Sequence, residues 1–319
     1  MKENHFTFTA DDGAKLFVYR WQPDFGIGKA IVHIAHGLAE HAGRYERLAE
    51  TLTENGYVVF ANDYRGHGQT AQQAEDVGHF SDENGWQRIL KDIEELVRLE
   101  RMEYPTHLVI LIGHSLGSLV AQHLATRNLF DAVVMSGANG IVSPLARVGK
   151  LVAKIERLRL GKRGKSETIN KLSFDAFNNA FKPNRTSFDW LSRDEAEVDK
   201  YIADQMCGFL CSTQLWLDLL GAMTEAAKPE FRAKVPKQLP LYLFSGSLDP
   251  VNEQGKGSTA LAEYYRSNGM EKVSYRIFTG ARHETLNETN REEVTEHLID
   301  WLNAIVKLLG MHAPSRAIQ

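Results

Sequence analysis

The sequence predicts an α/β protein with a doubly wound, mostly parallel sheet and an inserted helical cap. Short runs of β-branched and aromatic residues are nearly continuous in hydrophobicity, which is typical of strands buried on both faces of a sheet. Longer amphipathic stretches separate these runs, and this alternation favours parallel strands joined by right-handed crossovers. The chain of 319 residues is long enough for one large α/β domain that carries an insertion.

The expected elements follow from these patterns in chain order. An antiparallel hairpin comes first, because two alternating segments within residues 6–21 flank the turn residues Asp11, Asp12 and Gly13. The apolar runs predict strands at residues 30–37, 57–63, 107–115, 131–138, 239–249 and 272–280. Apolar side chains at helical spacing predict helices at residues 44–55, 83–101, 116–127 and 289–309.

The alternation breaks between residues 141 and 235, where the sequence has helical patterns and no convincing strand. This stretch is much longer than an ordinary loop, so we expect it to form a helical cap over the sheet. The predicted division is therefore a core made of residues 1–140 and 236–319, with residues 141–235 as the inserted cap.

Charge and cysteine content exclude other classes of protein. The chain has 37 basic and 41 acidic residues and a formal net charge of −4, so no overall positive field is available to hold nucleic acid. Cys207 and Cys211 are too few for a disulfide framework, and we interpret them as buried thiols on one face of a helix. The sequence shows neither a signal peptide nor an apolar run of about 18 residues, so we expect a cytoplasmic protein.

A GxSxG pentapeptide, Gly113-His114-Ser115-Leu116-Gly117, stands between a predicted strand and a predicted helix. This context gives the motif its meaning, because the serine must sit on a cramped strand-to-helix turn where only glycine fits on either side. We therefore expect Ser115 to be a catalytic nucleophile. Its hydroxyl needs a base to take its proton and a third group to orient that base.

Two later residues complete this arrangement in the expected chain order of serine, aspartate and histidine. Asp249 and His283 both stand just beyond the carboxyl ends of predicted strands, where open α/β sheets place their sites. We predict that His283 is the general base and that Asp249 orients it. A turn residue at Asp249 and a helix cap at His283 are the structural alternatives. His114 is expected to pack beside the serine without a proton-transfer role.

Acyl transfer develops negative charge on an oxygen atom, which needs two preorganised backbone N–H donors. We expect one from Leu116, the residue after the nucleophile, and the other from Leu38, in the loop after the first buried strand. No cofactor is predicted. His36, Glu40 and His41 lie close together, but their spacing matches neither HExxH nor HxxEH, so no metal site is predicted.

Five motifs, HGLAEHAGRYERLAE, NDYRGHGQT, GHSLGS, SGSLDPVN and RHETLNE, together resemble the monoacylglycerol lipase and lysophospholipase branch of the α/β-hydrolase superfamily. The resemblance implies the α/β-hydrolase fold, a cap over the site, and the same roles for Ser115, Asp249 and His283, with Leu38 and Leu116 as oxyanion donors. The first two motifs match loop signatures that we interpret as scaffolding of the oxyanion loop. The family commonly has glycine where this chain has Ala39.

The predicted function is a serine hydrolase that cleaves carboxylic esters of lipid-like substrates, such as a monoacylglycerol or a lysophospholipid, through an acyl-enzyme. A peptidase or thioesterase on the same scaffold is the alternative within enzymes. A non-catalytic receptor that keeps the pocket is the alternative outside them. Epoxide hydrolysis is disfavoured, because that chemistry uses aspartate where this chain has Ser115.

Residues 147–165 of the predicted cap, from Arg147 to Lys165, hold eight basic residues and the single acidic residue Glu156. Their apolar residues fall on one stripe of a helix with a basic polar side. The helix could pack this stripe on the core, or the segment could contact an anionic membrane surface peripherally. The stripe consists of Val148, Leu151, Val152, Ile155 and Leu158.

Overall fold

The computed structural model describes residues 1–141 and 144–311, and of residues 144–147 only the backbone. Within this part of the chain, eight strands form one sheet in the order β1-β2-β4-β3-β5-β6-β7-β8, which confirms the α/β prediction. The strands are β1 (Lys2–Thr9), β2 (Lys15–Gln22), β3 (Ala30–Ala35), β4 (Tyr57–Asn62), β5 (Leu108–His114), β6 (Ala132–Ser136), β7 (Leu241–Gly246) and β8 (Val273–Phe278).

The strand directions follow the hydrophobic patterns. β1 and β2 form the expected antiparallel hairpin, with Phe6 opposite Val18, and β2 runs antiparallel to β4. From β4 across to β8 every neighbouring pair is parallel. All residues of β3, β4, β6 and β7 are buried, as their continuous hydrophobicity predicts.

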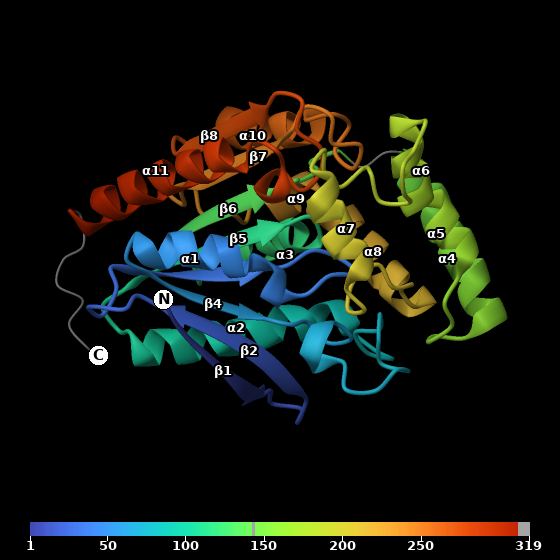
Figure 1. Cartoon of the computed structure of the whole chain (residues 1–319), viewed down its shortest axis with the longest axis horizontal. Helices are drawn as coiled ribbons and strands as arrows, with labels where there is room; N and C mark the ends of the chain where they lie inside the picture. The colour runs from blue at the N-terminus through green and yellow to red at the C-terminus, as the bar shows by residue number, and fades with distance from the viewer. Residues whose placement is uncertain (142–143, 312–319) are drawn as a thin grey trace.

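Helices cover both faces of the sheet (Figure 1). Successive strand residues point to opposite faces, so Ile31 packs in the core under α2, α3 and α10, whereas Val32 packs in the core under α1 and α11. The predicted helices are present, and α10 is an additional one that we did not predict. These helices are α1 (Glu46–Glu54), α2 (Gly85–Glu103), α3 (Leu116–Leu124), α10 (Lys256–Ser267) and α11 (Arg291–Gly310).

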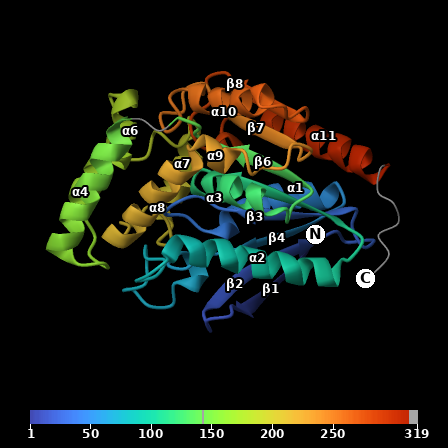
Figure 2. The same ribbon diagram turned by 180° about the vertical axis from the view of Figure 1, so that it is seen from behind.

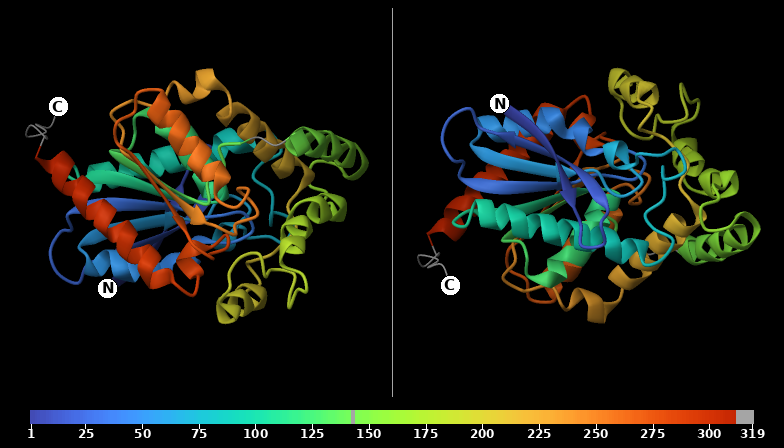
Figure 3. Two further views of the ribbon diagram at one scale, coloured as in Figure 1. Left: turned by 90° about the horizontal axis from the view of Figure 1, so that it is seen from above. Right: turned by 90° about the horizontal axis from the view of Figure 1, so that it is seen from below.

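A run of helices separates β6 from β7 and gathers toward one end of the sheet (Figures 2 and 3). The described residues of this run contain no strand beyond one isolated bridge between Lys165 and Ser212. The helices occupy the segment expected to form the cap, and the boundaries at 141 and 235 stay a prediction. They are α4 (Pro144–Leu160), α5 (Glu167–Leu172), α6 (Phe174–Asn178), α7 (Glu195–Ala203), α8 (Thr213–Ala226) and α9 (Pro229–Arg232).

Short 3₁₀ turns lie at several corners of the fold. They are η1 (Ala42–Tyr45), η2 (Gly68–Thr70), η3 (Ala125–Arg127), η4 (Asn179–Phe181) and η5 (Thr285–Asn287). Cys207 and Cys211 lie in the non-helical connection between α7 and α8, so the helical interpretation of their spacing is wrong. Both thiols are free; Cys211 is buried and Cys207 is partly exposed.

Candidate active site

Ser115 occupies the sharp turn between β5 and α3. Its backbone has φ 53° and ψ −113°, a conformation that costs a non-glycine residue free energy and that is frequent at functional sites. A Cβ atom at Gly113 would collide with the backbone of Gly117, and one at Gly117 would collide with the backbone of Ala35. Both glycines are therefore needed for the close approach of helix and strand on which the motif depends.

The side chain of His283 is held by Asp249. The His283 Nδ1 atom lies 2.9 Å from both Oδ1 and Oδ2 of Asp249, and both side chains are buried. Asp249 also accepts hydrogen bonds from the Val251 N–H at 2.9 Å and the Ser245 hydroxyl at 3.3 Å. Burial by itself would lower the pKa of His283, but the charge and hydrogen bond of Asp249 outweigh burial and raise this pKa above its usual value.

Ser115 and His283 both lie next to residues 136–137, at the end of β6. A Cβ atom at Gly137 would lie 3.1 Å from the His283 Cε1 atom, and the preceding residue, Ser136, accepts the Ser115 N–H at 2.9 Å. Among the described residues, no hydrogen bond joins the Ser115 hydroxyl to His283. Such a bond commonly tightens only in the substrate complex, so the arrangement suits proton transfer from Ser115 to His283.

His114 packs against His283. Its ring centroid is 4.8 Å from that of His283, and its Nδ1 atom is 3.1 Å from the Ser136 hydroxyl. Burial, with a further contribution from the charge of His283, lowers the pKa of His114 to about 4. His114 is therefore neutral near pH 7 and occupies the packing role expected from the sequence.

The two predicted oxyanion donors line the same cavity as Ser115. Leu38 lies in the loop after β3 and Leu116 is the first residue of α3. In the described part of the chain, neither backbone N–H donates a hydrogen bond to another protein atom. Leu116 stands in the first turn of a helix, where N–H groups have no partner within the helix. Both groups are thus available to an oxygen atom bound beside Ser115.

The loop that carries Leu38, residues 36–41, is held from several sides; we call it the oxyanion loop. His36 Nε2 accepts the Tyr64 N–H at 3.1 Å, so its Nδ1 donates to the Gly37 carbonyl oxygen at 2.7 Å. Burial lowers the pKa of His36 well below its usual value and keeps this tautomer neutral. Ala39 has φ +56°, the left-handed conformation that favours glycine. This explains why glycine is common here in the resembling family.

A large cavity opens beside Ser115, with a volume of about 420 Å³. Its walls are mainly apolar and come from the core and from α4, α5, α6 and α8. Cap side chains supply much of this apolar lining, among them Phe174, Phe177, Trp190, Trp216, Leu219 and Met223. A cavity with this lining suits an acyl chain better than a charged or strongly polar ligand.

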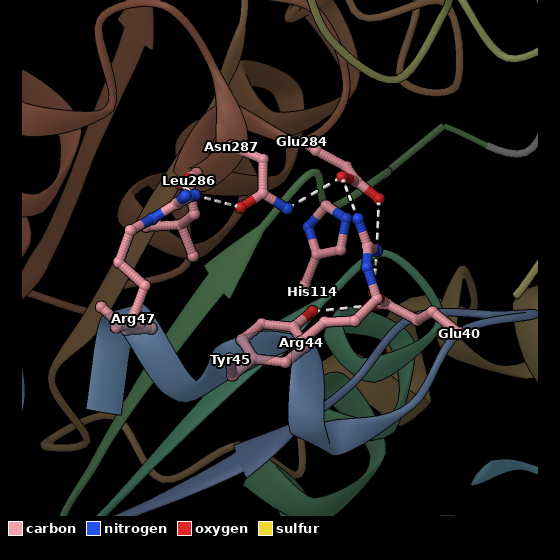
Figure 4. A pocket seen from close by; sticks show the side chains of 9 residues that line it. Glu40, Arg44, Tyr45, Arg47, His114, Glu284, Leu286 and Asn287 are labelled. Atoms are coloured by element: carbon pink, nitrogen blue, oxygen red, sulfur yellow. Dashed lines mark hydrogen bonds and ion pairs between the residues drawn. The ribbon is translucent and has the colours of Figure 1, made fainter. Parts of the chain in front are cut away.

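Sequence reasoning missed two residues next to His283. The ring of Trp190, from the cap, packs on that of His283 with a centroid separation of 5.1 Å. Glu284, next to His283 in the chain, is buried and forms a bidentate ion pair with Arg44 (Figure 4). Its position directly after the predicted base was a signal, but its partner stands 240 residues earlier in the chain.

The described residues contain one group of side chains that could hold a metal ion. The ligand atoms of His41, Asp204 and Cys207 all lie within 4.8 Å of one another. His41 Nε2 already pairs with Asp204 Oδ2 at 2.8 Å, and burial raises the pKa of the Cys207 thiol despite the nearby charge of Arg44. The neighbouring guanidinium and the neutral thiol both disfavour a cation here, so the chemistry of this group does not fit a metal site.

Comparisons with known proteins show what this chain is similar to. The family model described as serine aminopeptidase, S33, matches residues 27–290. The monoglyceride lipase of Mus musculus is 29% identical over 302 residues, which cover 92% of this chain and 88% of that protein. The monoacylglycerol lipase of Mycolicibacterium smegmatis is 27% identical, with 93% of this chain and 95% of that protein covered.

Solved structures extend the likeness to three dimensions. A highly thermostable carboxyl esterase from Bacillus coagulans in complex with glycerol superposes with a TM-score of 0.87 at 26% identity, covering 96% of this chain and 99% of that one. A soluble variant of monoglyceride lipase from Saccharomyces cerevisiae superposes with a TM-score of 0.75 at 20% identity, covering 96% and 97% of the two chains. This second likeness supports the α/β-hydrolase fold alone.

Proposed function

Because the chain belongs to the serine aminopeptidase S33 family of α/β-hydrolases, we propose that it is a serine esterase acting on lipid-like carboxylic esters. Its relatives place it among hydrolases of the lipase and esterase type. The single observation that carries the narrower proposal is that Ser115 opens onto a mainly apolar cavity of about 420 Å³. That cavity accommodates one acyl chain with its ester carbonyl beside the serine.

Each residue of the site has a defined task in this mechanism. The Ser115 oxygen attacks the ester carbonyl carbon while His283 takes the hydroxyl proton. Asp249 orients the imidazole and stabilises its protonated form, and the N–H groups of Leu38 and Leu116 bind the negatively charged oxygen. His283 then protonates the departing alcohol, which leaves an acyl-enzyme. Water, deprotonated by the same histidine, releases the fatty acid and restores Ser115.

The substrate class proposed is a monoacylglycerol or a lysophospholipid. The glycerol in the Bacillus coagulans esterase complex and the names of the monoglyceride lipases support a glycerol ester. Hydrolysis of monoacylglycerol, lysophospholipid, p-nitrophenyl ester, acyl-CoA and aminoacyl-anilide should be compared under one set of conditions, with Ser115→Ala as the blank. We expect the glycerol esters to have the highest kcat/KM. A preference for acyl-CoA or the anilide would instead establish the thioesterase or peptidase alternative.

Covalent labelling distinguishes an enzyme from a receptor that binds its ligand without turnover. A fluorophosphonate probe reacts only with a serine that its base activates. We expect stoichiometric labelling of the parent protein and none of Ser115→Ala. An unlabelled, folded parent protein would favour the receptor alternative.

We also propose that α4 contacts a membrane surface. Most of its apolar stripe faces solvent; Leu151 is 59% exposed and Leu158 is 90% exposed, whereas Val152 is partly buried against the core. The helix does pack on the core, through Val152 and Ala153, but the other four residues of the stripe are exposed. Lys154 and Arg159 are exposed on the same helix, although the side chain of Arg147 lies outside the described residues.

This surface supports peripheral binding to anionic lipid by a cytoplasmic protein. Apolar side chains enter the interfacial layer, and each nearby basic group adds about 1 kcal/mol of attraction to anionic lipid. No described helix has the length and hydropathy to cross a bilayer. Sedimentation with phosphatidylserine-containing and pure phosphatidylcholine vesicles tests the proposal, and negligible binding to both would end it.

A further inference from the structure

We propose that Arg44 is a positioning residue that holds the oxyanion loop in register with the loop that carries His283. This inference rests on the proposed function, because it concerns how the two halves of that site are kept together. Arg44 lies in η1, directly after the oxyanion loop, and touches carboxylates from both sides of the site (Figure 4).

The first contact fixes the loop of the base. Arg44 Nη1 and Nη2 donate to Glu284 Oε1 and Oε2, each at 2.8 Å. Two parallel hydrogen bonds between planar groups set orientation as well as distance. The Glu284 N–H donates to the Leu191 carbonyl oxygen at 2.8 Å, and the Asn287 side chain donates to Glu284 Oε2 at 2.9 Å. The backbone directly after His283 is therefore constrained on three sides.

The second contact fixes the oxyanion loop. Arg44 Nη1 also donates to Glu40 Oε2, and the other oxygen, Oε1, accepts the Gly37 N–H and the Tyr45 hydroxyl, the latter at 2.8 Å. Gly37 is the residue before Leu38, whose N–H we assign to the oxyanion. A shift of Glu40 would consequently turn the peptide groups next to that donor.

Burial makes this arrangement sensitive to the loss of any partner. The side chains of Arg44, Glu40 and Glu284 are 12%, 4% and 7% exposed. Burial alone would raise the pKa of Glu284, but the charge and hydrogen bonds of Arg44 hold this pKa below its usual value. A buried carboxylate that loses its guanidinium partner is strongly destabilised, so these residues behave as one unit. Lysine cannot replace the planar fork of Arg44, because its ammonium group is a point charge.

The network formed by Arg44, Glu40 and Glu284 acts through other residues and does not bind substrate. Its side chains and His114 line a separate cavity of about 20 Å³, which has room for about one water molecule and is far too small for an acyl group. Neither Arg44 nor Glu284 lines the large cavity beside Ser115. Removal of Arg44 is therefore expected to change turnover with little effect on substrate affinity.

Glu284 also contributes charge to the base. Its carboxylate favours protonated His283, as that of Glu40 does. Replacement of Glu284 by glutamine keeps the shape, leaves Arg44 paired with Glu40, and removes one negative charge. The charged or titratable side chains around His283 are Asp249 from the loop after β7, His114 from β5, Glu40 and Arg44 from the segment after β3, and Glu284 beside it.

Arg44→Lys and Glu284→Gln test the proposal on the full chain, with hydrolysis of a water-soluble p-nitrophenyl ester as the assay. Arg44→Lys keeps the charge and loses the bidentate geometry, so we expect kcat to fall about 10- to 100-fold while KM changes less than about threefold. Arg101→Lys is the matched control. Its guanidinium pairs with Asp131 at 3.0 Å beside the first residues of β5 and β6, at the opposite end of the strands from Ser115, so kcat should stay at the parent value.

Glu284→Gln supplies a second, independent readout. We expect the acid limb of its kcat/KM profile to move to lower pH, because His283 loses a neighbouring negative charge. In the double variant Arg44→Lys/Glu284→Gln, the loss of kcat should not exceed that of the worse single variant, since residues that act as one unit are not additive.

The outcomes separate this inference from the proposed function. Parent-like kcat in folded Arg44→Lys, or an unshifted acid limb in folded Glu284→Gln, overturns the positioning role. If Arg44→Lys does not fold, the acid limb of the kcat/KM profile of Glu284→Gln alone tests the inference. Full activity in Ser115→Ala would instead overturn the proposed function, whatever the Arg44 variants show.

Discussion

The carbonyl oxygen of Ala39 accepts a hydrogen bond from the hydroxyl of Tyr201 at 2.8 Å. Ala39 belongs to the oxyanion loop and Tyr201 to α7, so a helix of the proposed cap directly supports the backbone beside a proposed oxyanion donor. The Gly208 N–H donates to the same carbonyl at 2.9 Å. The conformation of this loop therefore depends on the cap as well as on the core.

Tyr201→Phe removes this support while keeping the ring. Tyr201 is buried and its hydroxyl also accepts the Gly208 N–H at 3.1 Å, so we expect a loss of about 1–2 kcal/mol in the free energy of unfolding and a several-fold fall in kcat. Urea denaturation and ester hydrolysis measure the two effects. Tyr264→Phe is the control, because its hydroxyl makes an exposed 3.3 Å bond to the Pro229 carbonyl. Equal losses in both variants would contradict the expectation.

Ala39→Gly should stabilise the protein. Alanine at φ +56° carries strain of about 1–2 kcal/mol, which exceeds the roughly 0.4–1 kcal/mol of added entropy in the unfolded glycine chain. We expect the free energy of unfolding to rise by about 0.5–1 kcal/mol. Ala49→Gly, at a buried position inside α1, should lower it by about 1 kcal/mol. A loss of stability in Ala39→Gly would show that the loss of the buried methyl group outweighs the relief of strain.

The pH profile of the parent enzyme should reflect the charge around its base. His283 accepts the serine proton only when neutral, and Asp249 raises its pKa above the usual value of about 6.5. Activity should therefore begin to fall, on lowering the pH, above the pH at which an unperturbed histidine titrates. The dependence of kcat/KM on pH measures this limb directly. A midpoint below 6 would contradict the assigned ion pair.

Ser115→Ala should abolish turnover and leave the fold intact. Removal of a triad nucleophile costs about 10⁶-fold in kcat in serine hydrolases of similar mechanism. The turn at φ 53° already accepts a residue with a Cβ atom, so we expect an unchanged far-ultraviolet circular dichroism spectrum. Substantial esterase activity in the purified variant would falsify the nucleophile assignment.

Leu158→Glu should weaken binding to anionic vesicles at least several-fold, because it places a negative charge at the most exposed position of the stripe on α4. Hydrolysis of a water-soluble ester should be unaffected, since this side chain does not line the large cavity. Met102→Glu is the control, as Met102 is also exposed, at 71%, but lies on α2. Vesicle sedimentation and ester hydrolysis supply the two measurements.

Local patterns were sufficient to predict most of the sheet. The continuous apolar runs that became β3, β4 and β7 are typical of strands buried on both faces, and their β-branched and aromatic residues favour a strand over a helix. The turn at Ser115 was equally readable, because the need for glycine at 113 and 117 is encoded within five residues. By contrast, α10 was not predicted, although Leu261, Ala262 and Tyr265 are buried on it at helical spacing.

Pairings between residues far apart in the chain could not be predicted from one sequence. Arg44 and Glu284 are 240 residues apart, and nothing in either segment shows that they meet. The stripe on α4 was recognised, but hydrophobic spacing cannot tell whether it faces the core or solvent. Spacing also misled for Cys207 and Cys211, because a four-residue interval is compatible with an irregular connection as well as with a helix.

Trp190 and Leu191 join the proposed cap to the proposed base. The Trp190 ring packs on that of His283, and the Leu191 carbonyl oxygen accepts the Glu284 N–H. Warming that loosens only this segment would free the imidazole while the eight-stranded sheet stays folded. The half-life of activity at elevated temperature is then governed by a small part of the molecule. Engineering for heat tolerance should accordingly begin at the contacts of Trp190 and Leu191 with the loop that carries His283. Calorimetry would report melting of the sheet and would miss this earlier, local loss of activity.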